Sequence, residues 1–340
     1  MDYCNAFEKL PKFIVEKLKD APLFFSKDYE QNVHDRGQKN LYIWSSSIIL
    51  VARIRKQWFM QAALLECEPF VYNVIETEDV TSFLNEAMKI LKKVGVQWTI
   101  TTNTARFHYY PEKAKTILSG NYIIDLTLPE DQLWQNVHSK HRNSIRRGEK
   151  GGIEMTCGHE DLINQYTFLS NETYQRSGQA TTSREYYAGL IKHLNNNSLI
   201  ALACKEGIEQ AGGMFLYNSA CAYYLHGAST FRPEPGSTNY LLWEIIKQMK
   251  EKGVKEFSFV GYHVNAEPGS KLEGIQNFKE RFGGKLENCY SFKYIQSCFF
   301  YKLYCFIMRL KSKNILKKYR DHIDQQIDQY PELNKKVDKK

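Results

Sequence analysis

The sequence predicts an α/β protein built from two copies of one domain, each a mixed, mostly antiparallel sheet flanked by helices. Three observations predict this. The chain has 340 residues, which is long for one domain. Hydrophobic residues make up 43% and charged residues 25%, a composition typical of a globular chain with a core. One pattern of helix, glycine and strand occurs twice along the chain.

The repeated pattern lies at residues 81–100, TSFLNEAMKILKKVGVQWTI, and at residues 239–260, NYLLWEIIKQMKEKGVKEFSFV. Each copy has apolar residues at helical spacing, then lysines, then Gly-Val and an alternating strand. The predicted apolar faces consist of Phe83, Leu84, Ala87, Met88 and Leu91, and of Leu241, Leu242, Ile245, Ile246 and Met249. The separation between residues 81–100 and 239–260 is far too long for a solenoid repeat, so it indicates a duplicated domain. The alternative is that two unrelated amphipathic helices, each followed by a strand, look alike by chance.

Short alternating segments before each helix predict strand meanders. They lie at residues 41–54 and 58–65 in the first copy, and at 199–204, 211–217 and 220–226 in the second. Turn residues such as Lys205-Glu206-Gly207 separate the later strands. We therefore expect a first domain over residues 1–125, a second over 126–298, and a C-terminal helix with a basic tail over 299–340.

Charge and cysteine content narrow the class of protein. The net charge of +8 favours mild attraction to anions such as nucleic acid, phosphorylated substrates or an anionic membrane. The eight cysteines include no CxxC pair and no Cys/His spacing suited to zinc, so we expect reduced thiols and no metal. We also expect a cytoplasmic protein, because no signal-peptide pattern or membrane-spanning run is found.

A basic segment at residues 139–150 is the first candidate site. It contains five Lys or Arg residues and one Glu. On a helix, Arg142, Arg146 and Lys150 would line one face, where guanidinium groups could bind phosphate or carboxylate. The alternative is a solvated basic surface.

The second candidate is the polar loop at residues 227–238, which contains Ser229 and Arg232 and leads into a helix. Unpaired backbone N–H groups at a helix N-terminus can hold an anion. The alternative is an ordinary capped loop.

Lys279 is the third candidate. Phe278 and Phe282 are four residues apart and would anchor a short helix to the core, which would fix the direction of the lysine. A fixed ammonium could stabilise the oxyanion of a tetrahedral acyl intermediate. The alternative is a surface lysine. His226 follows two tyrosines on a predicted strand, where a core or supporting role is favoured over a catalytic one.

Four segments together resemble the Fem family, aminoacyltransferases that build peptidoglycan interpeptide bridges, and related GNAT-like acyltransferases. These segments are Leu133–Met155, Tyr223–Ser229, Asn239–Gly261 and Gly274–Gly284. The resemblance implies two tandem GNAT-like domains. It also implies aminoacyl-tRNA as donor and, as acceptor, a peptidoglycan precursor that can be lipid-linked, with no separate cofactor.

The resemblance assigns roles to individual residues. Lys279 matches the family's lysine near the reacting carbonyl. Arg184 and Tyr187 resemble an Arg and a Tyr that hold the acceptor, and Tyr224 resembles a pocket tyrosine. No general base is evident.

Two other functions stay open at this point. One is transfer from an acyl-CoA to an amino sugar or polysaccharide precursor, although the loop before Asn239 lacks the closely spaced glycines of the GNAT pyrophosphate turn. The other is a non-catalytic binding protein of the same fold.

The aromatic-rich segment FFYKLYCFIMRL, residues 299–310, has two interpretations. It could touch the membrane peripherally as an amphipathic segment. It could instead pack back on the first domain as a terminal helix, which is the preferred interpretation.

Overall fold

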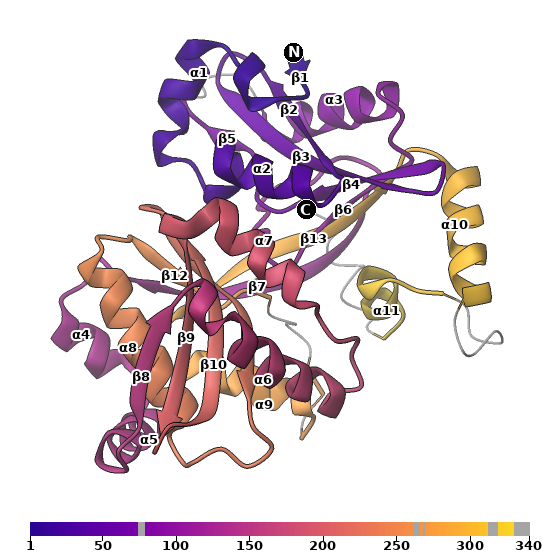
Figure 1. The fold of residues 1–340 in the computed structure, drawn as a ribbon. Coiled ribbons are helices and arrows are strands. Elements are labelled where there is room, and N and C mark those ends of the chain that lie inside the picture. The colour runs from indigo at the N-terminus through magenta and orange to yellow at the C-terminus, as the bar shows by residue number, and fades with distance from the viewer. Residues whose placement is uncertain (74–78, 262–265, 268, 312–318, 330–340) are drawn as a thin grey trace. The chain divides into compact units, whose positions relative to one another are not determined.

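A computed structural model describes residues 1–73, 79–261, 266–267, 269–311 and 319–329 (Figure 1). The chain divides into two compact units. Unit 1 consists of Met1–Gly120, Gly261–Asn265 and Asn288–Lys340. Unit 2 consists of Asn121–Val260 and Ala266–Glu287. The predicted α/β class with mostly antiparallel sheets is confirmed, since β4 with β6 and β11 with β12 are parallel whereas most other strand pairs are antiparallel.

The sheet of unit 1 has the strand order β1-β2-β3-β4-β6-β13, with β5 paired to β3. The bounds are β1 Asp2–Cys4, β2 Lys39–Trp44, β3 Ile48–Gln57, β4 Met60–Leu65, β5 Phe70–Val71, β6 Trp98–Thr101 and β13 Lys285–Ile295. The helices are α1 Lys12–Lys17, α2 Lys27–Asp35, α3 Val80–Lys93, α10 Cys298–Lys311 and α11 His322–Gln329. Short 3-10 helices lie at Phe7–Lys9, Leu18–Asp20 and Leu23–Phe25.

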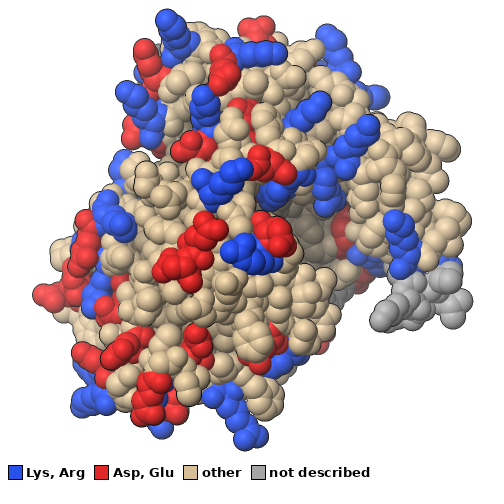
Figure 2. Space-filling view, in the orientation of Figure 1, with Lys and Arg blue, Asp and Glu red and all other residues tan. Residues whose placement is uncertain are grey.

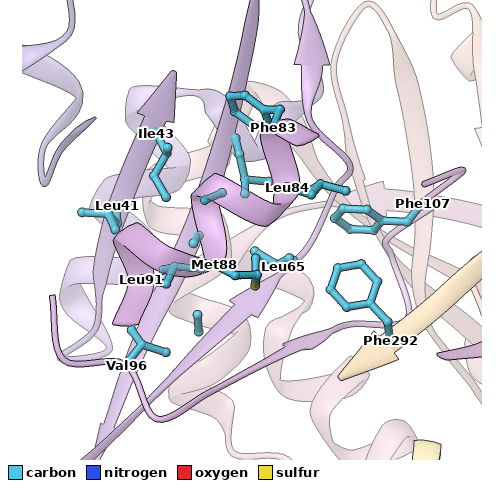
Figure 3. Packing of buried hydrophobic residues seen from close by; sticks show 14 of the residues in the cluster. Leu41, Ile43, Leu65, Phe83, Leu84, Met88, Leu91, Val96, Phe107 and Phe292 are labelled. Carbon is cyan, nitrogen blue, oxygen red and sulfur yellow. The ribbon is translucent and has the colours of Figure 1, made fainter. Parts of the chain in front are cut away.

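Helix α3 fills the core of unit 1 with the face that the sequence predicts. All five of its predicted apolar residues are buried. They pack on Leu41 and Ile43 of β2 and on Leu65 of β4 (Figure 3). The side chain of Asp79 accepts the N–H of Thr81 at 2.9 Å and so caps the helix start. The apolar period and a polar cap therefore account for this helix.

The sheet of unit 2 has the order β7-β12-β11-β10-β9-β8. The bounds are β7 Lys115–Asp125, β8 Glu154–Gly158, β9 Ser198–Lys205, β10 Ile208–Tyr217, β11 Cys221–Ser229 and β12 Glu256–Ser258. The helices are α4 Glu130–Asn136, α5 Ser139–Lys150, α6 Ile163–Arg176, α7 Arg184–Leu194, α8 Ser237–Glu251 and α9 Lys271–Glu280. Short 3-10 helices lie at Glu160–Leu162 and Asn195–Asn197.

The two units share one order of elements, as the repeated sequence pattern predicts. In each, an antiparallel hairpin leads into a helix, and the next strand pairs in parallel with the second hairpin strand. Helix α8 buries its predicted face as α3 does. The last strand of each sheet comes from a distant part of the sequence: β7 follows the strands of unit 1 but pairs in unit 2, and β13 follows the strands of unit 2 but pairs in unit 1. Residues 123–125 of β7 pair with β12, and residues 293–295 of β13 pair with β6.

The described C-terminal residues, 288–311 and 319–329, group with unit 1. Helix α10 packs Tyr301 and Tyr304 against Trp98, with the rings of Trp98 and Tyr304 4.5 Å apart. The ammonium of Lys293, which is fully buried, lies 2.6 Å from Asp321 and 2.8 Å from Asp324. A buried charge needs such partners, so the residues beyond β13 are tied to this sheet. Among the described helices, none combines the length and apolar character that crossing a bilayer requires.

Candidate functional site

An opening between two parallel strands of unit 2 is the centre of the candidate site. Strands β11 and β12 pair only over Cys221–Tyr223 and Glu256–Ser258. Strand β12 then ends, while β11 continues to Ser229. Within the described part of the chain, no strand pairs with this edge of β11 beyond Tyr223. Side chains of α6 bond part of this stretch, because the Tyr166 hydroxyl donates to the His226 carbonyl and the Ser229 N–H donates to Thr173, both at 2.9 Å. A strand edge without a partner strand can offer its remaining backbone donors and acceptors to a ligand.

A β-bulge lies beside the opening. The register between β10 and β11 shifts after Met214, which pairs with His226, whereas Phe215 pairs with Tyr224. Leu225 is therefore the extra residue. A bulge of this kind changes the direction of neighbouring side chains and increases the local twist. Tyr224 and His226 stand on either side of it, so the bulge sets how both side chains are presented.

Lys279 lies at the end of β12, on the other side of the opening. Helix α9 begins at Ser270, whose hydroxyl accepts the N–H of Glu273 at 3.1 Å. As predicted, Phe278 and Phe282 anchor this helix, and the Phe282 ring lies 5.3 Å from that of Phe259. The Lys279 ammonium donates a hydrogen bond to the carbonyl of Val260, two residues after β12. The lysine is therefore not a simple surface residue.

Burial changes the chemistry of Lys279. Removal of its ammonium from water lowers the pKa of Lys279 to about 8. Its partner Val260 has a φ of +39°, a left-handed conformation that is costly for a β-branched residue. The structure thus holds a cation with a reduced pKa at a strained backbone position beside an open strand edge.

Tyr224 lines the β11 side of the opening. Its ring is stacked on Phe215 at 5.2 Å and meets the Phe259 ring edge-on at 6.3 Å. Burial raises the pKa of the Tyr224 hydroxyl, which is therefore un-ionised. Gly227 leaves room for this hydroxyl, because a Cβ at that position would lie 2.1 Å from the Tyr224 oxygen. Phe259 therefore contacts both Tyr224 on β11 and Phe282 beside Lys279.

His226 is the centre of a tyrosine cluster that the sequence analysis did not predict. Its Nδ1 lies 2.9 Å from the hydroxyl of Tyr174 on α6, and its Nε2 lies 3.2 Å from that of Tyr186 on α7. Burial lowers the pKa of His226 to about 4, so the ring is neutral near pH 7. A neutral imidazole donates from one nitrogen and accepts at the other, which matches two hydroxyl partners. The sequence does contain the tyrosines at 166, 174 and 186, but nothing in their spacing relates them to His226.

Tyr187 and Arg184 both lie on α7 but in different environments. Tyr187 is fully buried, and its hydroxyl lies 2.7 Å from that of Ser170. It supports the tyrosine cluster by packing on His226 at 6.0 Å. Arg184 is exposed, and its Nε donates to the side chain of Asn164 at 2.8 Å. The contacts of Arg184 are thus with the start of α6, whereas Tyr187 packs within the cluster.

The predicted anion-binding face of α5 does not form as expected. The Arg142 guanidinium donates to the carbonyls of Gln135, at 3.0 Å, and Val137, at the end of α4. It therefore satisfies helix-terminal carbonyls in place of a ligand. Arg146 lies over the ring of Trp134, at 5.3 Å. It lines a hollow of about 310 Å³ that also contains four acidic residues: Glu130, Asp131, Glu149 and Glu244. This environment disfavours a polyanion.

The loop before α8, the second candidate site, lies close to α5. Gly236 and Gly148 allow α5 to approach the start of α8, because a Cβ on Gly236 would lie 2.2 Å from the carbonyl oxygen of Ser144. Helix α5 therefore lies against the N-cap residue of α8, while Thr238, Asn239 and Tyr240 in the first turn are half-buried. The Ser229 carbonyl accepts from Arg176 at 2.7 Å, and Arg232 lies over the ring of Phe231 on the surface.

The geometry defines a duplicated α/β fold with a lysine and a tyrosine at an opened parallel strand pair. The FemAB family model matches residues 57–207, so the predicted resemblance to the Fem family is confirmed. The crystal structure of FemX aligns with 89% of this chain and 99% of its own, with a TM-score of 0.68 and 14% identity.

Two further solved structures have the same fold. The C-terminal domain of a putative lysylphosphatidylglycerol synthetase from Agrobacterium fabrum is 15% identical, covering 85% of this chain and 92% of its own (TM-score 0.54). L-PGS from Bacillus licheniformis is 13% identical, covering 84% of this chain and 92% of its own (TM-score 0.53). No curated protein matches the sequence. At these identities the likeness shows the fold, and together with the family match it supports an acyltransferase.

Proposed function

We propose that this protein transfers an aminoacyl group from aminoacyl-tRNA to an amine of a cell-wall precursor. The observation that carries the proposal is the Lys279 ammonium, held by the Val260 carbonyl at the open end of β12. Acyl transfer is accelerated by a fixed hydrogen-bond donor or cation where the carbonyl oxygen becomes negative, and Lys279 can provide one. The family match supports the same class of reaction.

The residues account for the main chemical events. The acceptor amine attacks the ester carbonyl of the donor, a C–N bond forms, and the carbonyl electrons move onto oxygen. Lys279 donates a hydrogen bond to that oxyanion. Collapse of the intermediate breaks the bond to the ribose oxygen, which receives the proton that the amine loses. Tyr224 supplies a neutral hydroxyl on the opposite side of the opening, suited to hold a polar group of either substrate.

The close approach of α5 to the start of α8 favours aminoacyl-tRNA over acyl-CoA as donor. A pyrophosphate bound at that helix would need its free N–H groups, but Gly148 of α5 lies against Gly236. The structural likeness to a putative lysylphosphatidylglycerol synthetase also supports aminoacyl transfer, because the name of that protein describes a product in which lysine is attached to a lipid.

The test supplies purified protein with a mixture of radiolabelled aminoacyl-tRNAs or with acyl-CoA, each with a peptidoglycan precursor that carries a free amine. We expect loss of label from tRNA and its appearance in the precursor. Consumption of acyl-CoA alone would overturn the proposed donor. If neither donor reacts while the precursor still binds, the protein is a binding protein of this fold.

A further inference from the structure

An apolar face of helix α10 points away from the core of unit 1. Tyr301 and Tyr304 form the buried side of this helix. On the other side, Phe299, Phe306 and Leu310 have 71%, 55% and 52% of their surface exposed. These residues are spaced by seven and four positions, so at 100° per residue they form a single stripe, with half-buried Leu303 between them.

Lysine and arginine are the only charged residues of α10 itself. The helix contains three of them, at positions 302, 309 and 311, and no Asp or Glu. Asp324 and Asp328 of α11 line a hollow together with Lys302, Phe306 and Arg309, and Asp324 is paired with Lys293. Lys302 is exposed beside the stripe on α10, and Arg309 follows two turns later. Figure 2 shows a largely uncharged surface over α10 that is interrupted by Lys or Arg.

A second aromatic element lies next to α10. Trp58 and Phe59 form the turn between β3 and β4, and 60% of the Phe59 surface is exposed. The Phe59 ring lies 6.3 Å from that of Phe300, and the Lys311 ammonium lies 4.5 Å from the ring centre of Trp58. Tryptophan and phenylalanine beside lysine are typical of surfaces at the lipid headgroup level.

We propose that α10 and the β3–β4 turn bind the surface of a bilayer that carries anionic phospholipid. The stripe enters the boundary between headgroups and acyl chains, and the basic residues contact lipid phosphates. The helix has 14 residues, about 21 Å at 1.5 Å per residue, so it lies along the interface.

The charge and the stripe together favour a membrane over other partners. A second copy of this chain would bring the same three cations of α10 against each other, which opposes pairing through this face. RNA would satisfy the cations and its bases could stack on exposed Phe rings, but it has no apolar layer into which Leu310 and the whole stripe could insert. A bilayer with anionic headgroups matches both features.

The test is sedimentation of the full chain with vesicles of phosphatidylcholine, either alone or with roughly one third phosphatidylglycerol. We expect binding to the anionic vesicles and a drop of about tenfold or more for the Phe299→Ser, Phe306→Ser double variant. The matched control is Phe13→Ser with Phe168→Ser, which removes two similarly exposed rings elsewhere and should leave binding unchanged. All four rings are exposed, so both variants should keep the wild-type melting temperature.

A charge series completes the test. Lys302→Gln with Arg309→Gln should lower binding to anionic vesicles by about fivefold per charge, whereas Lys12→Gln with Lys17→Gln on α1 should have little effect. Equal loss in the α10 and control variants would overturn the proposal. The proposal would also be overturned if the wild-type chain did not bind vesicles and instead dimerised, or bound RNA, through α10.

Discussion

The parallel strand pairs of the two units differ in one respect, although their elements follow the same order. In unit 1, β4 and β6 pair over four residues and end together at Leu65 and Thr101. The next N–H, of Thr102, donates to the Leu65 carbonyl at 2.9 Å, which keeps this pair closed. In unit 2, β12 stops after three paired residues while β11 continues. The difference comes mainly from β11, which continues past the pair to Ser229, whereas β4 ends with its pair at Leu65.

The side chains around the two pairs follow this difference. Beyond the closed pair of unit 1, Thr104 donates its hydroxyl to the Glu66 carbonyl at 2.8 Å, so neighbouring residues satisfy the backbone. Beyond the open pair of unit 2 lie Lys279, with its reduced pKa, and Tyr224. The open strand pair and the two candidate side chains therefore occur in the same unit.

The strongest test of this comparison removes the cation from the open pair. Lys279→Met should lower turnover by about 100- to 1000-fold, the effect of losing one donor to an oxyanion. The matched control is Lys271→Met at the start of the same helix, where the ammonium donates to Ser177 at 2.9 Å. Steady-state kinetics with a saturating donor measures both. Equal turnover in the two variants would remove Lys279 from the reaction.

The wild-type pH profile provides a second readout for the same lysine. The ammonium predominates below its pKa of about 8, so catalysis that needs the charge should fall as pH rises through that value. Deprotonation of an acceptor amine would act in the opposite direction, because it increases the supply of nucleophile. A rate that only rises between pH 7 and pH 9 would therefore contradict the proposed role.

A smaller effect should come from filling the space on the β11 side of the opening. Gly227→Ala places a methyl group against the Tyr224 hydroxyl, so the ring must leave its stack on Phe215. We expect a loss of about 1–3 kcal/mol in the free energy of unfolding, together with reduced turnover. Gly274→Ala on α9 is the matched control, since an added Cβ there meets no atom within 4 Å. Urea titration compares the two, and equal stability would mean that Tyr224 is not fixed by this contact.

The sequence predicted those parts of the site that depend on local spacing. The apolar period located α3 and α8, and the Phe278–Phe282 pair located Lys279 on an anchored helix. The opening was not predictable in this way, because it depends on which strands pair and where β12 ends. The pairing of β7 with β12 and of β13 with β6 was not predictable for the same reason, because the residue pattern of a strand does not specify which strand it pairs with. His226 gained its role from Tyr174 and Tyr186, which lie on two helices distant in sequence.

Arg142 shows the same limit and gives the smallest predicted effect. The residue spacing correctly predicted that Arg142 lies on a helix. Its guanidinium, however, donates hydrogen bonds to carbonyls at the C-terminal end of α4. Arg142→Ala should therefore lower the free energy of unfolding by about 1 kcal/mol, through loss of charged hydrogen bonds to helix-terminal carbonyls. Arg147→Ala, an exposed neighbour on α5, should change stability much less. If Arg142→Ala instead left stability unchanged and weakened RNA binding in a salt-dependent way, α5 would belong to the site of unit 2, and the strand opening alone would not define it.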